Sequence, residues 1–291
     1  GIYAALDGVK AACGEDEVNI IGYCLGGTLT GATLAHMAAN NDERVKSATF
    51  FTSLVDFQEA GELSVFIDDE QLGQLEQKME EQGGILEGAA MASTFNMLRS
   101  NDLIWSFVIN NYLMGKDPFP FDLLYWNSDS TRMPAKMHSF YLRNMYQENL
   151  LSQPGGIEMG GCPIDLRAVK IPVHIISTKE DHIAPWKGTY VATQLYTGET
   201  TFTLAGSGHI AGIVNPPSAH KYGYWSNADN PPAPDDWFAG ATQHEGSWWP
   251  QWGKWVARHS GRKIKARQPG SKDAPVLEDA PGSYVKVRSD G

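Results

Sequence analysis

Short apolar runs alternate with stretches of helical periodicity over residues 1–215, and four of these runs have the composition of buried strands. They are EVNIIGYC (17–24), VKSATFFTS (45–53), PVHIIST (172–178) and TTFTLA (200–205). GGTLTGATLAHMAAN at 26–40 and WKGTYVATQLY at 186–196 carry apolar residues at helical spacing. Strands that alternate with helices predict an α/β fold, in which a parallel sheet has helices on its faces.

Residues 54–170 lie between the two strand-forming parts and have a different pattern. The segment begins with an acidic stretch, DDEQLGQLEQKMEEQGG, and continues with apolar and aromatic residues typical of helices. We expect Glu76, Lys78, Glu80 and Glu81 to form an exposed face, and Leu103, Phe107 and Tyr112 to form a packed face. A helical insertion of this kind predicts a cap over the strand ends.

The C-terminal region is rich in proline, glycine and tryptophan and predicts little regular structure except one helix near 248–258. Its tryptophans, Trp248, Trp249, Trp252 and Trp255, have spacings that let three or four of them share one helix face. Packing against the core is the first interpretation, and a surface that binds a polymer or a partner is the alternative. The predicted organisation is a core at 1–53 and 171–215, a cap at 54–170 and a C-terminal region at 216–291.

Composition excludes several classes of protein. The chain has 291 residues, 42% of them hydrophobic, and a formal net charge of −11, which argues against binding to nucleic acid. Three scattered cysteines give neither a disulfide framework nor a zinc site, so we expect no metal and a reducing, cytoplasmic setting. The longest apolar stretch, at 20–39, is interrupted by polar residues, and the start of the sequence lacks a signal-peptide pattern, so no membrane span is expected.

The segment Gly22-Tyr23-Cys24-Leu25-Gly26-Gly27 lies between a predicted strand and a predicted helix. It has the form of a nucleophile elbow, a tight strand-to-helix turn that presents a reactive side chain at the edge of a sheet. Side chains at Gly22 and Gly26 are expected to clash where strand and helix approach. The helix N-terminus favours the thiolate, so we interpret Cys24 as a nucleophile rather than as a buried cysteine in a glycine-rich turn.

A cysteine nucleophile needs a base, and the base is usually oriented by a carboxylate. Asp181 comes directly after the strand PVHIIST, and His209 comes directly after TTFTLA. Both follow the carboxyl ends of strands, where such folds place their sites, and the order nucleophile, acid, histidine is that of α/β-hydrolases. A helix-capping role for Asp181 and a plain loop position for His209 are the alternatives. His182 is a further candidate for substrate contact, with a structural role equally open.

Cysteine in place of serine bears on the type of reaction. A thiolate that attacks a thioester forms another thioester, which remains reactive enough to acylate an alcohol. If water enters next, the enzyme is a hydrolase; if a hydroxyl-bearing chain enters a dry pocket, the enzyme is a transferase. The long insertion at 54–170 is large enough to exclude water, and this favours a transferase.

These motifs together resemble the class I polyhydroxyalkanoate synthases. GYCLGGT resembles their lipase-box-like nucleophile motif, and the segments FNMLRSNDLIWSFVINNYLMG and PFDLLYWNSDSTRMPAKMHSFYLRNMY resemble their cap. KEDHIAPW and GSGHIAGIVNPP resemble the acid and histidine segments, and APGSYVKVR resembles a class I terminus. The resemblance covers essentially the whole chain and implies an α/β-hydrolase fold with a largely helical cap.

The resemblance also implies a function for each candidate residue. Cys24 would carry the acyl or polyester chain, His209 would activate it, and Asp181 would activate the 3-hydroxyl of the incoming unit. The backbone N–H of Leu25 is expected to stabilise the oxyanion. The implied substrate is (R)-3-hydroxyacyl-CoA, with 3-hydroxybutyryl units expected, and CoA is released as a co-product, so no separate cofactor is expected. The implied partners are a second copy in a homodimer, the growing polyester and granule-associated proteins, at the surface of cytoplasmic granules.

One feature departs from the family. The residues before Glu17 leave no room for the earlier strands of an α/β-hydrolase sheet, so we expect a chain that lacks the beginning of the catalytic domain and the second oxyanion donor. Two other functions remain as alternatives. Dienelactone hydrolases also pair cysteine with aspartate and histidine, but they place the acid much closer to the nucleophile. A non-catalytic granule scaffold would leave Cys24, Asp181 and His209 unexplained.

Overall fold

The computed structural model describes residues 1–98, 100–118, 129 and 131–287, and the chain divides into two compact units. Unit 1 contains residues 1–64 and 144–275, and unit 2 contains residues 65–143 and the C-terminal segment that begins at Val276. The boundaries of unit 2 differ from those of the predicted insertion, because residues 54–64 and 144–170 cluster with the sheet of unit 1.

Unit 1 is built on a six-stranded sheet with the strand order β1-β2-β7-β8-β9-β10. The strands are β1 (Val18–Tyr23), β2 (Val45–Phe51), β7 (Val173–Thr178), β8 (Thr200–Ala205), β9 (Gly223–Ser226) and β10 (Thr242–Glu245). The first four are parallel, as the sequence predicts, whereas β9 and β10 add to the sheet antiparallel. All six residues of β7 are buried, which explains why apolar and β-branched residues dominate its sequence.

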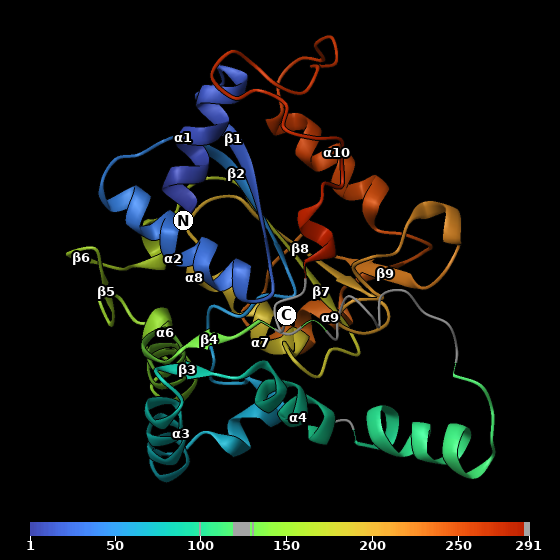
Figure 1. The fold of residues 1–291 in the computed structure, drawn as a ribbon. Helices are drawn as coiled ribbons and strands as arrows, with labels where there is room; N and C mark the ends of the chain where they lie inside the picture. Colours follow the sequence, from blue (N-terminus) through green and yellow to red (C-terminus); the bar gives the residue numbers. More distant parts are fainter. Residues whose placement is uncertain (99, 119–128, 130, 288–291) are drawn as a thin grey trace. The chain divides into compact units, whose positions relative to one another are not determined.

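The two faces of the sheet are covered by different helices, and Figure 1 shows α2 (Leu25–Ala39) and α10 (Trp249–His259) on either side of it. Alternate residues of β2 point to opposite faces. Phe50 stacks on Tyr196, which directly follows α8, at a ring-centroid distance of 5.4 Å. Thr49 on the other face accepts a hydrogen bond from the Trp252 indole of α10 at 3.0 Å.

The remaining elements of unit 1 are shorter or lie at its periphery. They are α1 (Ile2–Cys13), α7 (Trp186–Tyr190), α8 (Ala192–Leu195), α9 (Pro234–Ala239), the hairpin strands β5 (Glu158–Met159) and β6 (Cys162–Pro163), and the single turns η5 (Leu150–Ser152), η6 (Leu166–Ala168) and η7 (Pro217–Ala219). The turns η1 (Gly61–Phe66) and η4 (Leu142–Gln147) lie at the ends of segment 65–143.

The C-terminal region of unit 1 is more regular than the sequence predicts. The expected helix is present as α10. Trp248 and Trp255 are packed, each 2% exposed, and Trp248 donates its indole N–H to the Gly212 carbonyl at 2.9 Å, whereas Trp249 is 37% exposed. Strands β9 and β10 are not expected from the sequence. They are four residues long and lie in a proline-rich stretch, so their pattern is too short to be recognised.

Unit 2 is mainly helical. Its elements are α3 (Asp69–Glu81), β3 (Ile85–Leu86), α4 (Gly88–Leu98), the π-helical turns η2 (Asn101–Trp105) and η3 (Val108–Leu113), β4 (Met133–Pro134), α6 (Ala135–Tyr141) and the single turn η8 (Tyr284–Lys286). Asp68 caps α3 by accepting a hydrogen bond from the Gln71 N–H at 2.8 Å. Leu72 and Met79 are seven residues apart on α3, and both are buried.

Two expectations for the insertion are wrong. Lys78, Glu80 and Glu81 are exposed as predicted. Glu76 is half-buried instead, because the Arg143 guanidinium donates two hydrogen bonds of 2.8 Å to its carboxylate. Phe107 and Tyr112 are 46% and 84% exposed rather than packed, since the contacts of η3 run mainly to its neighbour η2. The side chain of Leu103 lies outside the described residues.

Candidate active site

Cys24 is the single residue between the end of β1 and the start of α2. Its φ of 52° is uncommon for a residue with a side chain and is held by hydrogen bonds on both sides. The Cys24 N–H donates to the Phe51 carbonyl, and the Cys24 carbonyl accepts from the Gly27 N–H, each at 2.9 Å. The turn is therefore an elbow at the carboxyl edge of the sheet, with Cys24 half-buried at its apex.

The glycines of the motif are required by a close approach of strand and helix. A Cβ atom on Gly22 would lie 2.5 Å from the Gly27 Cα, and a Cβ atom on Gly27 would lie 1.9 Å from the Ser53 Oγ. The expectation for Gly26 is wrong, because a Cβ atom there would meet nothing within 4 Å. Gly27, one residue further along the helix, faces the sheet instead, so it is Gly27 that must lack a side chain.

Asp181 and His209 come together from two neighbouring strands. They follow β7 and β8 respectively, and the Nδ1 of His209 lies 2.7 Å from the Oδ2 of Asp181. The Asp181 side chain has no solvent exposure. Its Oδ1 accepts hydrogen bonds from the N–H groups of Ile183 and Ala184 at 2.9 Å, and Thr178 donates to Oδ2 at 3.2 Å. Both oxygens of the Asp181 carboxylate are thus bound by groups of the protein itself.

The ionisation of His209 links it to both partners. Burial lowers the pKa of His209, but hydrogen bonds to Asp181 and Cys24 and the negative charges of both groups raise it to about 9. A histidine held in this way, next to the sulfur of a nucleophile, is suited to take its proton and to return it. The structure therefore brings together Cys24, Asp181 and His209, as the sequence predicts, in a geometry suited to acyl transfer.

Tyr23 is part of this site and was not singled out from the sequence. Its ring stacks on the His209 ring at a centroid distance of 5.6 Å, and its hydroxyl donates to the His209 carbonyl at 2.8 Å. Burial, with Cys24 and Asp181 close by, raises the pKa of Tyr23 to about 12, so the phenol remains a donor. Period-two alternation along β1 indicates that Tyr23 points away from the face of Gly22, but its contact with His209 depends on a loop distant in sequence.

The two other predicted site residues have different surroundings. Leu25 is the first residue of α2, where the N–H groups have no intrahelical acceptor, so its N–H is available beside Cys24. His182 follows Asp181 and is half-buried, and its backbone carbonyl lies 3.1 Å from where a Cβ atom on Gly61 would lie. A contact between the His182 ring and a substrate stays a prediction.

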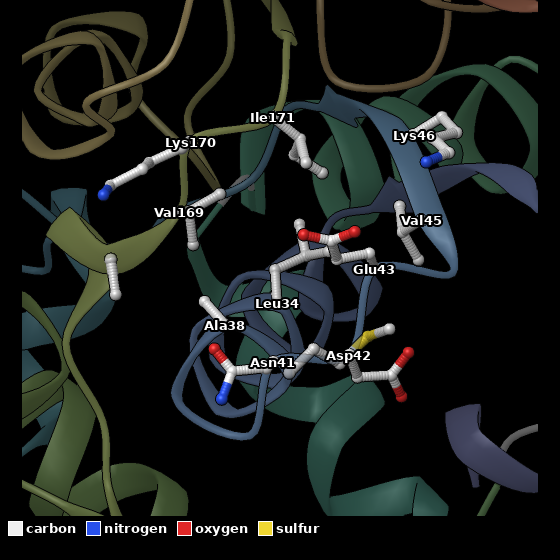
Figure 2. A pocket seen from close by; sticks show the side chains of 12 residues that line it. Leu34, Ala38, Asn41, Asp42, Glu43, Val45, Lys46, Val169, Lys170 and Ile171 are labelled. Atoms are coloured by element: carbon white, nitrogen blue, oxygen red, sulfur yellow. The ribbon is translucent and has the colours of Figure 1, made fainter.

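The cavity in Figure 2 is not part of this site. It has a volume of about 560 Å³ and lies at the opposite, amino-terminal edge of the sheet, between the end of α2 and the segments that lead into β2 and β7. Leu34 of α2, Val45 of β2 and Val169 line it together with the charged side chains of Asp42 and Lys46. None of the five predicted site residues contributes to its wall.

Two kinds of feature are absent from the described residues. No group of three or more histidine, cysteine, aspartate or glutamate side chains is arranged to hold a metal ion. No described helix combines the length and the apolar character needed to cross a lipid bilayer.

Comparison with known proteins identifies the fold family. The family model described as alpha/beta hydrolase fold matches residues 2–216, and the chain belongs to this family. This confirms the fold class predicted from the order of strands, elbow, acid and histidine.

The chain is similar to poly(3-hydroxyalkanoate) polymerases, which confirms the family resemblance of its motifs. It is 54% identical over 289 residues to the poly(3-hydroxyalkanoate) polymerase subunit PhaC of Rhizobium meliloti, covering 99% of this chain and 47% of that protein. It is 50% identical over 290 residues to the polymerase of Methylorubrum extorquens (99% and 48%) and 40% identical over 298 residues to that of Cupriavidus necator (99% and 50%). The chain spans about half the length of these curated relatives.

Proposed function

We propose that this chain carries the acyl-transfer site of a polyhydroxyalkanoate synthase, an acyltransferase that polymerises (R)-3-hydroxyacyl-CoA with release of CoA. The observation that carries the proposal is the half-buried Cys24 at an elbow, within hydrogen-bonding reach of a histidine whose other nitrogen lies 2.7 Å from a buried carboxylate. The similarity to named polymerases over 99% of the chain supports the substrate class.

The first half-reaction follows from this geometry. His209 takes the proton of Cys24, and the thiolate attacks the carbonyl carbon of the substrate thioester. The Leu25 N–H stabilises the negative charge on the carbonyl oxygen. The bond to the CoA sulfur breaks, His209 returns the proton to that sulfur, and free CoA leaves an acyl thioester on Cys24. CoA enters as part of the substrate, so the reaction needs no separate cofactor.

In the second half-reaction we assign the base to His209 rather than to Asp181. The resemblance implies that Asp181 activates the 3-hydroxyl of the incoming unit, but its carboxylate has no solvent exposure and accepts hydrogen bonds on both oxygens. His209 keeps some exposure and stands next to Cys24. Asp181 then acts as a positioning residue, which holds the tautomer and orientation of the imidazole.

The resemblance supports further proposals about the surroundings of the site. Segment 54–170 contains the cap that excludes water from the acyl thioester, the active form is a homodimer, and the protein works at the surface of cytoplasmic polyester granules. His182 contacts the substrate near Asp181. The dimer is tested by light scattering of the purified protein with and without substrate, and a species that stays monomeric throughout would contradict it.

The function is tested with (R)-3-hydroxybutyryl-CoA by following CoA release, the acylation of Cys24 by mass spectrometry, and the product. Insoluble polyester supports a synthase, whereas free hydroxy acid would show a hydrolase, and neither release nor acylation would show a scaffold. Cys24→Ala is expected to abolish release and acylation. Cys162→Ala is the matched control, because Cys162 is also a half-buried free thiol but lies in the β6 hairpin, and it is expected to retain both.

A further inference from the structure

A cluster of unpartnered buried polar atoms lies where α10 packs on the sheet, away from Cys24. Nine buried side-chain nitrogen or oxygen atoms in the described part of the chain have no hydrogen-bond partner, and four of them belong to this region. They are His174 Nδ1, Gln251 Oε1, Trp255 Nε1 and His259 Nε2. Buried polar groups are nearly always satisfied, so four such atoms around one helix need an explanation.

A cavity of about 420 Å³ lies beside three of the residues that carry these atoms. It is lined by His174, Thr201, Gln251, Lys254, Trp255 and Arg258. His174 is 1% exposed and Trp255 is 2% exposed, and their rings meet edge to face at a centroid distance of 5.1 Å. The other nitrogen of His174 lies 2.9 Å from the Thr203 Oγ1, which fixes the ring and leaves Nδ1 as the unsatisfied atom. His174 and Trp255 therefore form a buried part of the cavity wall that carries polar atoms.

The mouth of this cavity is positively charged. Lys254 and Arg258 are four residues apart on α10, so they lie on the same side of the helix, and the sequence of α10 contains no acidic residue. Neither cation takes part in an ion pair among the described residues, although the chain has a net charge of −11. Burial, and to a smaller extent the nearby Arg258, lower the pKa of His174 to about 3, so this ring is neutral.

A position in the last turns of α10 explains part of this arrangement. Cations near a helix C-terminus are favourable because they face the negative end of the helix dipole, and this applies to Arg258. The helix dipole does not explain why Trp255 Nε1 and Gln251 Oε1 are buried without hydrogen-bond partners. A ligand that accepts a hydrogen bond from the indole, donates one to the amide oxygen and carries negative charge would satisfy all three features.

We propose that this cavity, the α10 pocket, binds a small oxyanion that carries a hydroxyl group. The anionic oxygens lie between Lys254 and Arg258 and accept from the Trp255 indole, while the hydroxyl donates to Gln251. A short hydroxycarboxylate and monohydrogen phosphate share this chemistry. The pocket is distinct from the Cys24 site, because His174 and Thr201 are the second residues of β7 and β8, whereas Asp181 and His209 follow the ends of these strands.

The test is an NMR titration that does not depend on catalysis. The protein is labelled with ¹⁵N-tryptophan, the Trp255 indole resonance is assigned with Trp255→Phe, and sodium phosphate or (R)-3-hydroxybutyrate is added at constant ionic strength. We expect a saturable shift of the Trp255 indole resonance with at least one anion. The anion that binds with the higher affinity shows whether the ligand is a hydroxycarboxylate or a phosphate. Butyrate, which lacks the hydroxyl, is expected to bind more weakly than 3-hydroxybutyrate.

Variants at the mouth separate a built site from general attraction to anions. Lys254→Gln with Arg258→Gln is expected to weaken binding about tenfold or more, since two charge-assisted hydrogen bonds are lost. Lys263→Gln is the matched control, because it removes an exposed cation beyond α10, and it is expected to keep the affinity. The absence of a saturable shift with either anion, or equal binding by the double variant when its melting temperature is unchanged, would overturn the proposal.

Discussion

The Asp181 carboxylate is the most fully coordinated group in the candidate active site. It accepts hydrogen bonds from two backbone N–H groups and one hydroxyl in addition to its contact with His209. A carboxylate fixed in this way orients a neighbour and has little freedom to turn toward a substrate. Whether removal of the Asp181 charge affects one half-reaction or both therefore distinguishes a positioning role from a direct role in catalysis.

For Asp181→Asn we expect Cys24 acylation and chain elongation to fall by similar factors, about 10²-fold or more, because both use His209 as the base. Rapid-quench measurement of acylation with a single equivalent of substrate, compared with steady-state CoA release, checks this. Elongation that is lost while acylation survives would show instead that Asp181 acts directly on the 3-hydroxyl.

Tyr23 offers a way to separate a ring contact from a hydrogen bond. Tyr23→Phe removes only the hydroxyl that donates to the His209 carbonyl, and we expect a loss of stability of about 1 kcal/mol with activity within a few-fold. Tyr23→Ala also removes the stacked ring, and we expect a larger fall in kcat with a shifted pH profile, since His209 is less constrained. Identical pH profiles for the wild type and both variants would contradict a positioning role.

The pKa of His209 predicts a specific dependence of stability on pH. It is about 9 in the folded protein against 6.5 for a free histidine, so the folded state holds this proton more tightly. The resulting stabilisation is complete below pH 6.5 and is lost as the pH rises through 9. The free energy of unfolding of the wild type minus that of His209→Gln should fall over this range, by an amount on the order of 1 to 3 kcal/mol. A difference that is constant with pH would show that the pKa is not raised.

Among the elements, α3 and α6 of unit 2 are held together by a charged network. Arg143, in η4 directly after α6, binds Glu76 of α3 with two hydrogen bonds from its guanidinium, and Ser139 of α6 donates to the same carboxylate. Hydrogen bonds from Arg143 and Ser139 lower the pKa of Glu76 to about 2, so it stays charged. The pair is about one third exposed, which limits its contribution to stability.

Glu76→Gln is expected to destabilise unit 2 by about 1 kcal/mol, the upper part of the range for a partly exposed bidentate pair. Hydrogen exchange of the α3 amides measures this locally, and we expect faster exchange there and no change in β7. Glu80→Gln removes an exposed carboxylate from the same helix and serves as the control. Equal exchange in the two variants would mean that the network adds nothing.

The same elements show what the sequence predicts and what it does not. The meeting of Cys24, Asp181 and His209 was predictable because each follows a strand whose apolar run is evident, and parallel strands bring their carboxyl ends to one edge. Gly27, rather than Gly26, faces the sheet because of the phase of α2, which is not visible in a motif. The exposed Tyr112 was not predictable, because apolar composition indicates a buried face only if another element covers it.

At the scale of the whole chain, the fold class was predictable but the division into units was not. The segment between β2 and β7 reads as one block of different composition, yet residues 144–170 cluster with the sheet. Leu151, Ile164 and Leu166 in this segment are buried, at 0 to 1% exposure. Such long-range packing decides which part of an insertion returns to the core, and it cannot be predicted from the local sequence pattern.

The adjacency of β2 and β7 also has a kinetic consequence. Phe51 ends β2 and Val173 begins β7, so the central parallel pair forms only after a very long loop has closed. Closure entropy grows with the logarithm of loop length, and a doubling adds only about 0.6 kcal/mol, so the inserted segment is thermodynamically tolerable. Contacts so distant in sequence slow folding much more than they lower stability. The chain is therefore expected to fold slowly, with the β1-α2-β2 and β7-α7-β8 segments forming before they join at the strand pair between the Cys24 elbow and the Asp181 loop.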